Sequence, residues 1–290
     1  MRTMHNFSVF ILTNGRADNV ITYKTLKNSD YTGNIRLLVD DEDKQLEKYK
    51  KNYKDEVIVF NKQEAIDMTD SMDNFKKRNS VVYARNIVYK KAKEKGFKYI
   101  LVLDDDYSFF GNCFNSKREY ITSGTTIRKL DRYIKAMLDF FINSKLDCLA
   151  MAQGGDFIGG SSSGVAKKYL NNQYSRKAMN AFFFDVDNPL YFKGRINEDV
   201  NMYIKEGSTG KKILTFGRIR LEQKQTQSNQ GGLTDIYLDL GTFVKSFYSI
   251  MINPSCVKLT KMGVVSPRIH HKIIWRNAVP QIIDERYKKR

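Results

Sequence analysis

One stretch limits what this chain can fold into, because a run of apolar residues leads directly into three carboxylates. Residues Tyr99–Leu103 are apolar or aromatic throughout and include β-branched side chains, a pattern typical of a buried strand rather than a half-exposed one. Asp104, Asp105 and Asp106 follow at once. Open α/β sheets bind ligands outside the carboxyl ends of their strands. The stretch therefore predicts an acidic ligand site at the end of a central strand.

Two of these aspartates are spaced to share one ligand. Asp104 and Asp106 are two residues apart in the sequence, so in an extended chain their side chains point the same way. Hard divalent cations such as Mg²⁺ take oxygen ligands and often share them with substrate phosphates. The pair predicts a site for a metal and a diphosphate. The alternative interpretation is a solvated acidic turn.

Strands and helices alternate through the first half of the chain. The alternation predicts a parallel sheet with right-handed crossovers. Asp18 is the expected N-terminal cap of the first helix, and Gly96 is the expected C-terminal cap of the helix before the central strand. The predicted strands are Phe7–Leu12, Ile35–Val39 and Val57–Phe60, and the predicted helices are Asn19–Asn28, a charged helix after residue 43, and Ser80–Lys95.

The second half is predicted to be more irregular. We find no internal repeat and no domain boundary, so we expect one domain over residues 1–290, with a sheet-forming half of about residues 1–110 and an irregular half of about residues 111–290. The predicted elements are helix Thr126–Asn143, strand Cys148–Ala152, loop Gly154–Gly164, strand Asn180–Val186, a helix that begins within Arg195–Val200, strands Lys212–Phe216 and Ile219–Leu221, a ligand-covering loop Glu222–Leu233 and a helix over Ile236–Met251.

The charge balance favours a polyanionic partner. The formal net charge is +17 and the pI is about 9.6. Clustered Lys and Arg release condensed counterions when they bind nucleic acid or another acidic surface. The alternative is a charge spread over the surface for solubility.

The cysteine and apolar content indicate a reducing compartment and no membrane span. Cys113, Cys148 and Cys256 are far apart and have no CxxC spacing, so neither a disulfide framework nor a zinc cluster is indicated. The apolar run at Phe7–Leu12 is too short for a signal sequence, and no stretch approaches the length of a transmembrane helix. We expect a soluble, intracellular protein.

Polar groups that follow the predicted parallel strands should meet at one edge of the sheet. Thr13, Arg16 and Asp40 each follow such a strand, as do the three aspartates after Leu103. An acidic residue after the second strand suits recognition of a base or ribose, and Arg16 and Arg85 suit phosphate. For Arg85 the alternative is a solvated surface charge.

The order of these motifs resembles that of nucleotide-sugar glycosyltransferases of the GT-A fold. Asp104-Asp105-Asp106 is preceded by Ala84-Arg85-Asn86 and followed much later by Glu198-Asp199. The resemblance implies a Rossmann-like, mostly parallel sheet flanked by helices, with a nucleotide-sugar-binding first half and an acceptor-binding second half. It also implies an acidic DxD element that binds Mn²⁺ or Mg²⁺ with the donor diphosphate.

A closer resemblance covers nearly the whole chain. The motifs that carry it are Thr13–Val20, Val39–Asp43, Leu103–Tyr107, Asn197–Val200 and His270–Lys272. With these motifs the chain resembles the bacteriophage glycosyltransferases associated with TET-type dioxygenases. The resemblance implies transfer of a sugar, from a donor similar to UDP-glucose, to 5-hydroxymethylcytosine in phage DNA in the cytoplasm of the infected host. The +17 charge independently favours a DNA acceptor.

These resemblances assign expected roles to individual residues. Asp106, assisted by Asp104, is the expected metal ligand, and His270 or His271 completes the metal site because neutral imidazole binds Mn²⁺. Asp199, with Glu198 second, is the expected base of an inverting reaction; the alternative is a helix N-terminal charge without chemistry. The expected donor-binding residues are Thr13, Arg16, Asp40, Arg85, Asp104, Asp105 and Lys272.

Three other functions fit parts of the sequence. A GT-A enzyme with a glycan or protein acceptor keeps the same donor chemistry. A nucleotidyltransferase also places aspartates after a strand to hold metals, but it would consume nucleoside triphosphates. A nucleic-acid-binding module without activity is disfavoured, because the acidic edge would repel phosphate unless a metal were bound.

Overall fold

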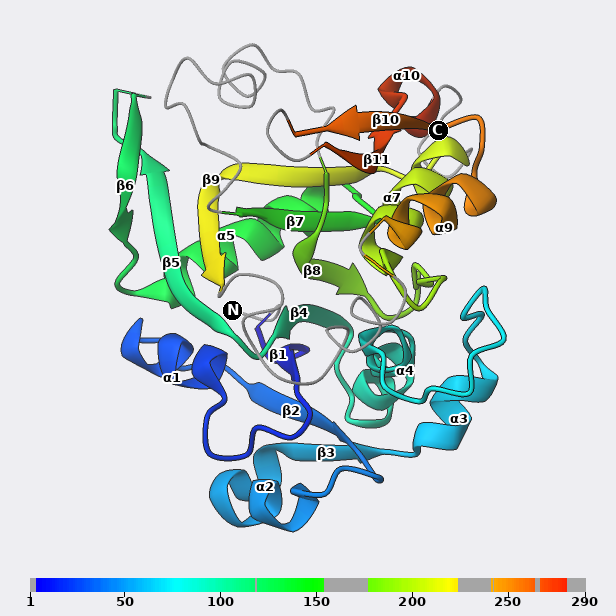
Figure 1. Ribbon diagram of the computed structural model, residues 1–290. Helices are drawn as coiled ribbons and strands as arrows, with labels where there is room; N and C mark the ends of the chain where they lie inside the picture. The colour runs from blue at the N-terminus through cyan, green and yellow to red at the C-terminus, as the bar shows by residue number, and fades with distance from the viewer. Residues whose placement is uncertain are drawn as a thin grey trace, which may run out of the picture.

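The computed structural model describes residues 4–117, 119–153, 177–223, 241, 243–263 and 267–280. Nine of the described strands form one mixed sheet in the order β3-β2-β1-β4-β8-β7-β9-β5-β6, and two more form a separate hairpin (Figure 1). The strands of the sheet are β1 (Phe7–Leu12), β2 (Ile35–Asp40), β3 (Val57–Phe60), β4 (Tyr99–Asp104), β5 (Tyr107–Phe114), β6 (Tyr120–Thr126), β7 (Cys148–Gln153), β8 (Asn180–Asp185) and β9 (Ile213–Gln223).

The first half is the predicted parallel sheet. β1 lies between β2 and β4 and is parallel to both, with Leu12 opposite Asp104. β3 extends the parallel set beyond β2. The carboxyl ends of β1, β2 and β4 therefore meet at one edge, which brings the segments that follow Leu12, Asp40 and Asp104 together. This alignment confirms the predicted convergence.

Helices cover both faces of the sheet. The alternation along β4 shows the division, because Ile100 and Val102 pack toward one hydrophobic cluster while Leu101 and Leu103 pack toward the other. Helices α3, α4 and α7 cover the first face, and α1, α2 and α5 cover the second. Their bounds are α1 (Ile21–Asn28), α2 (Leu46–Tyr53), α3 (Lys62–Asp67), α4 (Val81–Glu94), α5 (Leu130–Asn143) and α7 (Glu198–Ser208), with a 3-10 helix η1 at Lys54–Glu56.

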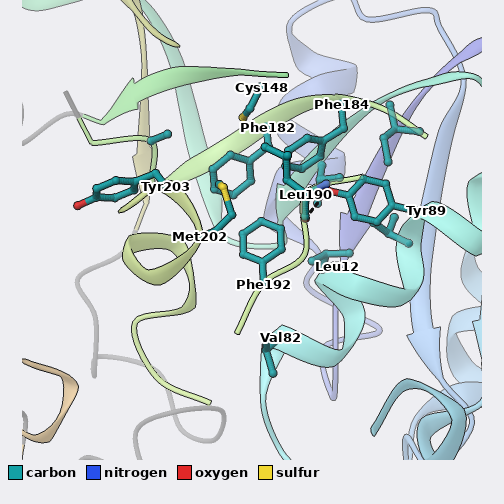
Figure 2. Close-up of a cluster of buried hydrophobic side chains, with 14 of the residues drawn as sticks. Leu12, Val82, Tyr89, Cys148, Phe182, Phe184, Leu190, Phe192, Met202 and Tyr203 are labelled. Atoms are coloured by element: carbon teal, nitrogen blue, oxygen red, sulfur yellow. Dashed lines mark hydrogen bonds between the residues drawn. The ribbon is translucent and has the colours of Figure 1, made fainter. Parts of the chain in front are cut away.

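Aromatic side chains fill the cluster beneath the carboxyl edge. Figure 2 shows Phe182 and Phe184 of β8 beside Phe192, and the rings of Phe182 and Phe192 meet at a centroid distance of 5.5 Å. Tyr89 of α4 donates a hydrogen bond of 2.9 Å to the carbonyl of Leu190. The Tyr89 ring also packs against Phe184, with a centroid distance of 5.3 Å, so α4 is held against the antiparallel strand β8.

The later elements form a smaller layer at one end of the molecule. Hairpin β10 (Val257–Met262) and β11 (Arg268–Ile273) is antiparallel. Helix α9 (Val244–Ile252) packs against both this hairpin and α7, and α10 (Trp275–Ala278) packs against α7 (Figure 1). No helix in the described part of the chain is both long and apolar enough to span a membrane.

Several predicted boundaries were wrong. Asp18 does not cap α1, because the helix begins at Ile21 with Val20 as its N-cap residue and no side-chain cap, while the Asp18 carboxylate pairs with Lys48. The helix predicted from Thr126 begins only at Leu130, because residues 120–126 pair as β6 and Lys129 takes a left-handed conformation with φ of 64°. By contrast, the predicted cap Gly96 has φ of 78° and follows α4 as expected.

The strands of the second half were only partly predicted. β5 and β6 were not predicted, and the two short strands around residue 217 are one strand, β9, whose pairing with β7 shifts between Phe216 and Arg220. The predicted loops Gly154–Gly164 and most of Glu222–Leu233, and the first residues of the helix predicted from Ile236, lie outside the described residues. That helix is described only as α9.

Candidate active site

The three aspartates occupy the tight connection between β4 and β5. Thr22 of α1 holds the backbone of this turn with three hydrogen bonds. Its hydroxyl donates to the carbonyl of Asp104 at 2.6 Å and accepts from the N–H of Tyr107 at 2.8 Å, and its own N–H donates to the carbonyl of Asp105 at 3.0 Å. The turn is therefore fixed by a helix from the first βα unit, and the three carboxylates leave it in defined directions.

Asp105 is turned inward and ties the turn to the loop after β1. Its carboxylate accepts a 2.7 Å hydrogen bond from the hydroxyl of Thr13 and pairs with the guanidinium of Arg16. Tyr49 of α2 contacts both partners, through the hydroxyl of Thr13 and the N–H of Arg16, each at 2.8 Å. Burial raises the pKa of Asp105, and the charge of Arg16 opposes that shift. These hydrogen bonds therefore fix the loop after β1 in the ligand-free protein.

Asp40, at the end of β2, likewise holds neighbouring side chains by hydrogen bonds. It is only 4% exposed, and it accepts hydrogen bonds from Lys62 at 3.0 Å and from the Asn14 amide at 2.8 Å. Its neighbour Asp43 accepts from the N–H of Gly15 at 2.7 Å. The structure therefore places Asp40 at the predicted edge, with its carboxylate already used by neighbouring side chains.

Arg85 joins the aspartate turn to the acidic start of α7. Its guanidinium bonds to both oxygens of Asp104, at 3.1 and 3.2 Å, and to Glu198 at 3.1 Å. The side chain is 4% exposed and lies against the rings of Phe182 and Phe192, with centroid distances of 5.3 and 5.5 Å. The alternative of a solvated surface charge is therefore wrong. Arg85 is a buried cation between two carboxylates.

Asp106 has a carboxylate without a partner for one of its oxygens. Its Oδ1 atom is buried and accepts no hydrogen bond from any described residue. Burial and the charges of Asp104 and Asp105 raise the pKa of Asp106 to about 6. Burying a carboxylate oxygen without a partner costs folding free energy. Hard divalent cations take carboxylate oxygens as ligands, so a bound cation would supply the missing partner. The residues present therefore fit a divalent metal at Asp106.

Glu198 and Asp199 differ in how their carboxylates are used. Both are in the first turn of α7, after Asn197, whose backbone has φ of 62°. Glu198 is 6% exposed and bound to Arg85. Asp199 is partly exposed, and the hydrogen bond described for it is from the N–H of Val200, at 2.8 Å. Burial raises the pKa of both carboxyls. Asp199 is the freer of the two.

The late histidines lie on β11 and not in the aspartate turn. His271 is 5% exposed, with neither ring nitrogen hydrogen-bonded, and the His270 ring lies 4.3 Å away, centroid to centroid. Lys272 is exposed on the same strand. Among the described residues, no group of three or more His, Cys, Asp or Glu side chains is arranged to hold a metal. The structure thus does not bring these histidines together with the aspartates as a ligand set.

Sequence reasoning missed the residues that position the site. Thr22, Tyr49 and Asp43 make the contacts described above, and Tyr107 donates to Asp104 at 3.3 Å. Thr22 and Tyr49 lie on helices. In the sequence they fit an amphipathic pattern, and nothing in that pattern indicates a role at the site. Asp43 ends the motif Val39–Asp43, but no role was predicted for it. No local motif marks such supporting contacts.

The fold is that of an α/β protein with its polar site at the carboxyl edge of a parallel sheet. The chain belongs to the TET-associated glycosyltransferase family, whose model matches residues 7–232. No curated protein matches the sequence.

Solved structures with similar folds include two phosphoglycerate glycosyltransferases. Glucosyl-3-phosphoglycerate synthase from Mycobacterium tuberculosis, solved with Mn²⁺, UDP and phosphoglyceric acid, has a TM-score of 0.47 and 9% identity, over 93% of this chain and 87% of that one. Mannosyl-3-phosphoglycerate synthase from Rubrobacter xylanophilus has a TM-score of 0.46 and 11% identity, over 92% of this chain and 86% of that one.

Proposed function

We propose that this protein transfers a sugar from a nucleotide-sugar donor similar to UDP-glucose to the hydroxyl of 5-hydroxymethylcytosine in phage DNA, with inversion at the anomeric carbon. The family name supports a glycosyltransferase linked to TET-type chemistry, and the net charge of +17 supports a DNA acceptor. Action on phage DNA would place the protein in the cytoplasm of the infected host.

One observation carries the proposal. Arg85 connects Asp104, at the end of the central strand, to Glu198, at the start of α7. Residues that sequence analysis assigned to the donor and to the chemistry are therefore joined by a single buried guanidinium. Such a link positions a base beside a donor site, which an inverting transfer requires, because the base must reach the acceptor as the donor bond breaks.

Asp106 and Asp104 are the residues we propose to hold a divalent cation, Mn²⁺ or Mg²⁺. Asp106 offers a buried oxygen without a partner, and Asp104 is 24% exposed in its side chain despite its bonds to Arg85. When bound, the cation neutralises the charge that develops on the departing nucleoside diphosphate. His270 and His271 were expected to complete the set, but among the described residues they belong to no group of three or more possible metal ligands.

Asp199 is the residue we propose as the base, with Glu198 as the second candidate. A primary hydroxyl is a weak nucleophile at neutral pH, so a carboxylate that accepts its proton accelerates transfer. Asp199 is partly exposed, whereas Glu198 is bound to Arg85. A raised pKa also suits a base, because the carboxylate then accepts a proton more readily.

We propose the donor contacts from how exposed each predicted donor-binding side chain is and from the residues that it already contacts. Arg16 is 32% exposed in its side chain, so its guanidinium can contact phosphate while Asp105 holds it in place. Thr13, Asp40 and Asp105 are buried in the loop network, and we propose that they shape the nucleotide site. Arg85 balances the charge of Asp104.

The test is mass spectrometry of nucleosides from DNA incubated with the protein, Mn²⁺ and a panel of nucleotide sugars. A hexose-sized mass gain on 5-hydroxymethylcytosine, absent from unmodified DNA, is the expected result. Asp106→Asn should remove the gain, while Asp139→Asn, which changes only an exposed i,i+4 pair, should not. Consumption of nucleoside triphosphates without sugar transfer would contradict the proposal and favour a nucleotidyltransferase.

A further inference from the structure

The β10–β11 hairpin carries basic side chains and no acidic ones. Its two strands have the sequences VKLTKM and RIHHKI. Lys258, Lys261, Arg268 and Lys272 are all exposed. Among the described residues, none of the four forms an ion pair, although many other lysines and arginines of the chain do. The hairpin thus concentrates positive charge that forms no ion pair with the described part of the chain.

The strand register sets like charges directly against each other. Lys258 is opposite Lys272. In an antiparallel pair the two side chains of opposite residues lie on the same face, and like charges there are destabilising. Two positions further along each strand, Thr260 is opposite His270, and Met262 is then opposite Arg268. One face of the hairpin therefore presents two lysines, an arginine and a histidine. An anion beside this face would relieve the repulsion between its like charges.

Helix α9 lies between the hairpin and the helix of the proposed base. It packs against β11 and against α7, whose first turn holds Asp199. Lys245 is in the first turn of α9. Burial lowers the pKa of Lys245, the charge of Arg268 acts in the same direction, and the charge of Asp199 opposes both. The cation of Lys245 is thus within electrostatic range of both the hairpin and the proposed base.

We infer that this basic hairpin face is the DNA-binding surface of the protein and that it holds backbone phosphates on either side of the modified base. The inference rests on the proposed function for its acceptor. A two-stranded β-ribbon fits the major groove of B-DNA, and substituents at C5 of a pyrimidine project into that groove. A duplex held on the hairpin would therefore present its 5-hydroxymethyl groups on the side that the ribbon faces. Phosphate contacts would set the register and supply the salt-dependent part of the affinity.

Lys258→Glu is the informative variant. It replaces a like-charge pair with opposite charges across from Lys272, so the hairpin should be as stable as before or more stable. Loss of DNA binding in this variant cannot then come from unfolding. Lys51→Glu is the matched control, because Lys51 is an exposed lysine on α2, at the opposite end of the molecule (Figure 1).

The measurement is fluorescence anisotropy with a labelled duplex at a series of salt concentrations, without donor or metal. Lys258→Glu should lower the affinity several-fold and reduce the slope of log K against log salt by about 1 to 2. Lys51→Glu should leave the slope unchanged. Equal effects of the two variants would overturn the inference, since only net charge would then matter.

Two further outcomes separate this inference from others. Binding is measured apart from transfer, so a protein that binds DNA through the hairpin and transfers no sugar to it would overturn the proposed acceptor and leave the hairpin assignment intact. Sugar transfer to DNA with an unchanged salt slope in Lys258→Glu would overturn the hairpin assignment alone. An oligomer in sedimentation that Lys258→Glu dissociates would assign the face to a second copy of the chain and also overturn it.

Discussion

Arg85 and Glu198 are 113 residues apart in the sequence, and the Nε atom of the arginine donates to Oε1 of the glutamate at 3.1 Å. Both side chains are almost fully buried. The same guanidinium binds Asp104, so one cation compensates two carboxylates that would otherwise repel each other. The bond also fixes α7 against α4, which sets the position of Asp199, the next residue along.

Arg85→Ala should destabilise the protein strongly. Removing one member of a buried ion pair leaves the other charges uncompensated and costs about 3–5 kcal/mol. The control is Arg78→Ala, which breaks the pair with Glu42, where both side chains are more than 40% exposed, and such exposed pairs contribute little to stability. Urea denaturation, followed by two spectroscopic probes, measures the free energy of unfolding of both variants. Equal losses in the two variants would mean that the buried bridge contributes no more than a surface pair.

Asp199→Asn should slow sugar transfer by about 100-fold or more, with donor binding retained. The amide keeps the size of the side chain but cannot take a proton. Glu198→Gln should slow transfer less, because the Glu198 carboxylate is bound to Arg85 and is not free to accept a proton. Calorimetry of UDP binding, single-turnover transfer and thermal unfolding separate these effects. If Glu198→Gln slows transfer more than Asp199→Asn does, at equal donor affinity, then Glu198 is the base.

Sequence patterns predicted the parallel half of the fold well. β1 and β4 are runs of apolar residues that are buried on both faces of the sheet, and such runs are visible without any tertiary information. β5 and β6 were missed because Tyr107–Thr126 mixes polar, aromatic and glycine residues with no period. These strands exist because β9 offers an edge for β5, which is a long-range contact.

The candidate site was predictable in its chemistry but not in its partners. The prediction that Asp40 and Asp104 meet at one edge of the sheet, which was made from the ends of the predicted strands, was correct. The buried state of Arg85 depends on Phe182 and Phe192, which come from a distant part of the chain. The spacing of the aspartates separated Asp106 from Asp105, but it did not predict their partners: Arg16 binds Asp105, whereas one oxygen of Asp106 is unpaired among the described residues. Tertiary packing made that distinction.

Asp106→Asn should abolish metal-dependent transfer and make the metal-free protein more stable at pH 7. The folded pKa of Asp106, about 6, is above the ordinary value of 3.8, so the fold disfavours the ionised form. The contribution of this group to stability is greatest below pH 3.8 and is lost as the pH rises through 6. The gain from Asp106→Asn should therefore be on the order of 1 kcal/mol at pH 7 and vanish near pH 4.

Thermal unfolding in the presence of a chelator measures this effect, with Asp139→Asn as the control. The exposed Asp139 is paired with Lys135, so its replacement should give no gain at either pH. A loss of stability in Asp106→Asn at pH 7 would show that the carboxylate has a partner in the metal-free protein. The metal fit argued from its unpaired oxygen would then fail.

The histidine pair should make the metal-free protein sensitive to acid. Burial, with a further contribution from Lys245, lowers the pKa of His270 to about 4, and burial and His270 lower that of His271 to about 3. Both values are below the ordinary 6.5, so protonation favours the unfolded chain. The stability that the neutral rings contribute is present above pH 6.5 and is lost as the pH falls toward these values.

We expect the unfolding free energy to fall by about 1–3 kcal/mol between pH 7 and pH 4 because of these two rings, as measured by urea denaturation with a chelator present. The double variant His270→Gln/His271→Gln should lose less stability over this interval than the wild type. His5→Gln is the matched control, since His5 is exposed and its replacement should leave the pH dependence unchanged. Parallel curves for all three proteins would mean that the rings are solvated, and would remove the hairpin histidines as candidates for any buried ligand site.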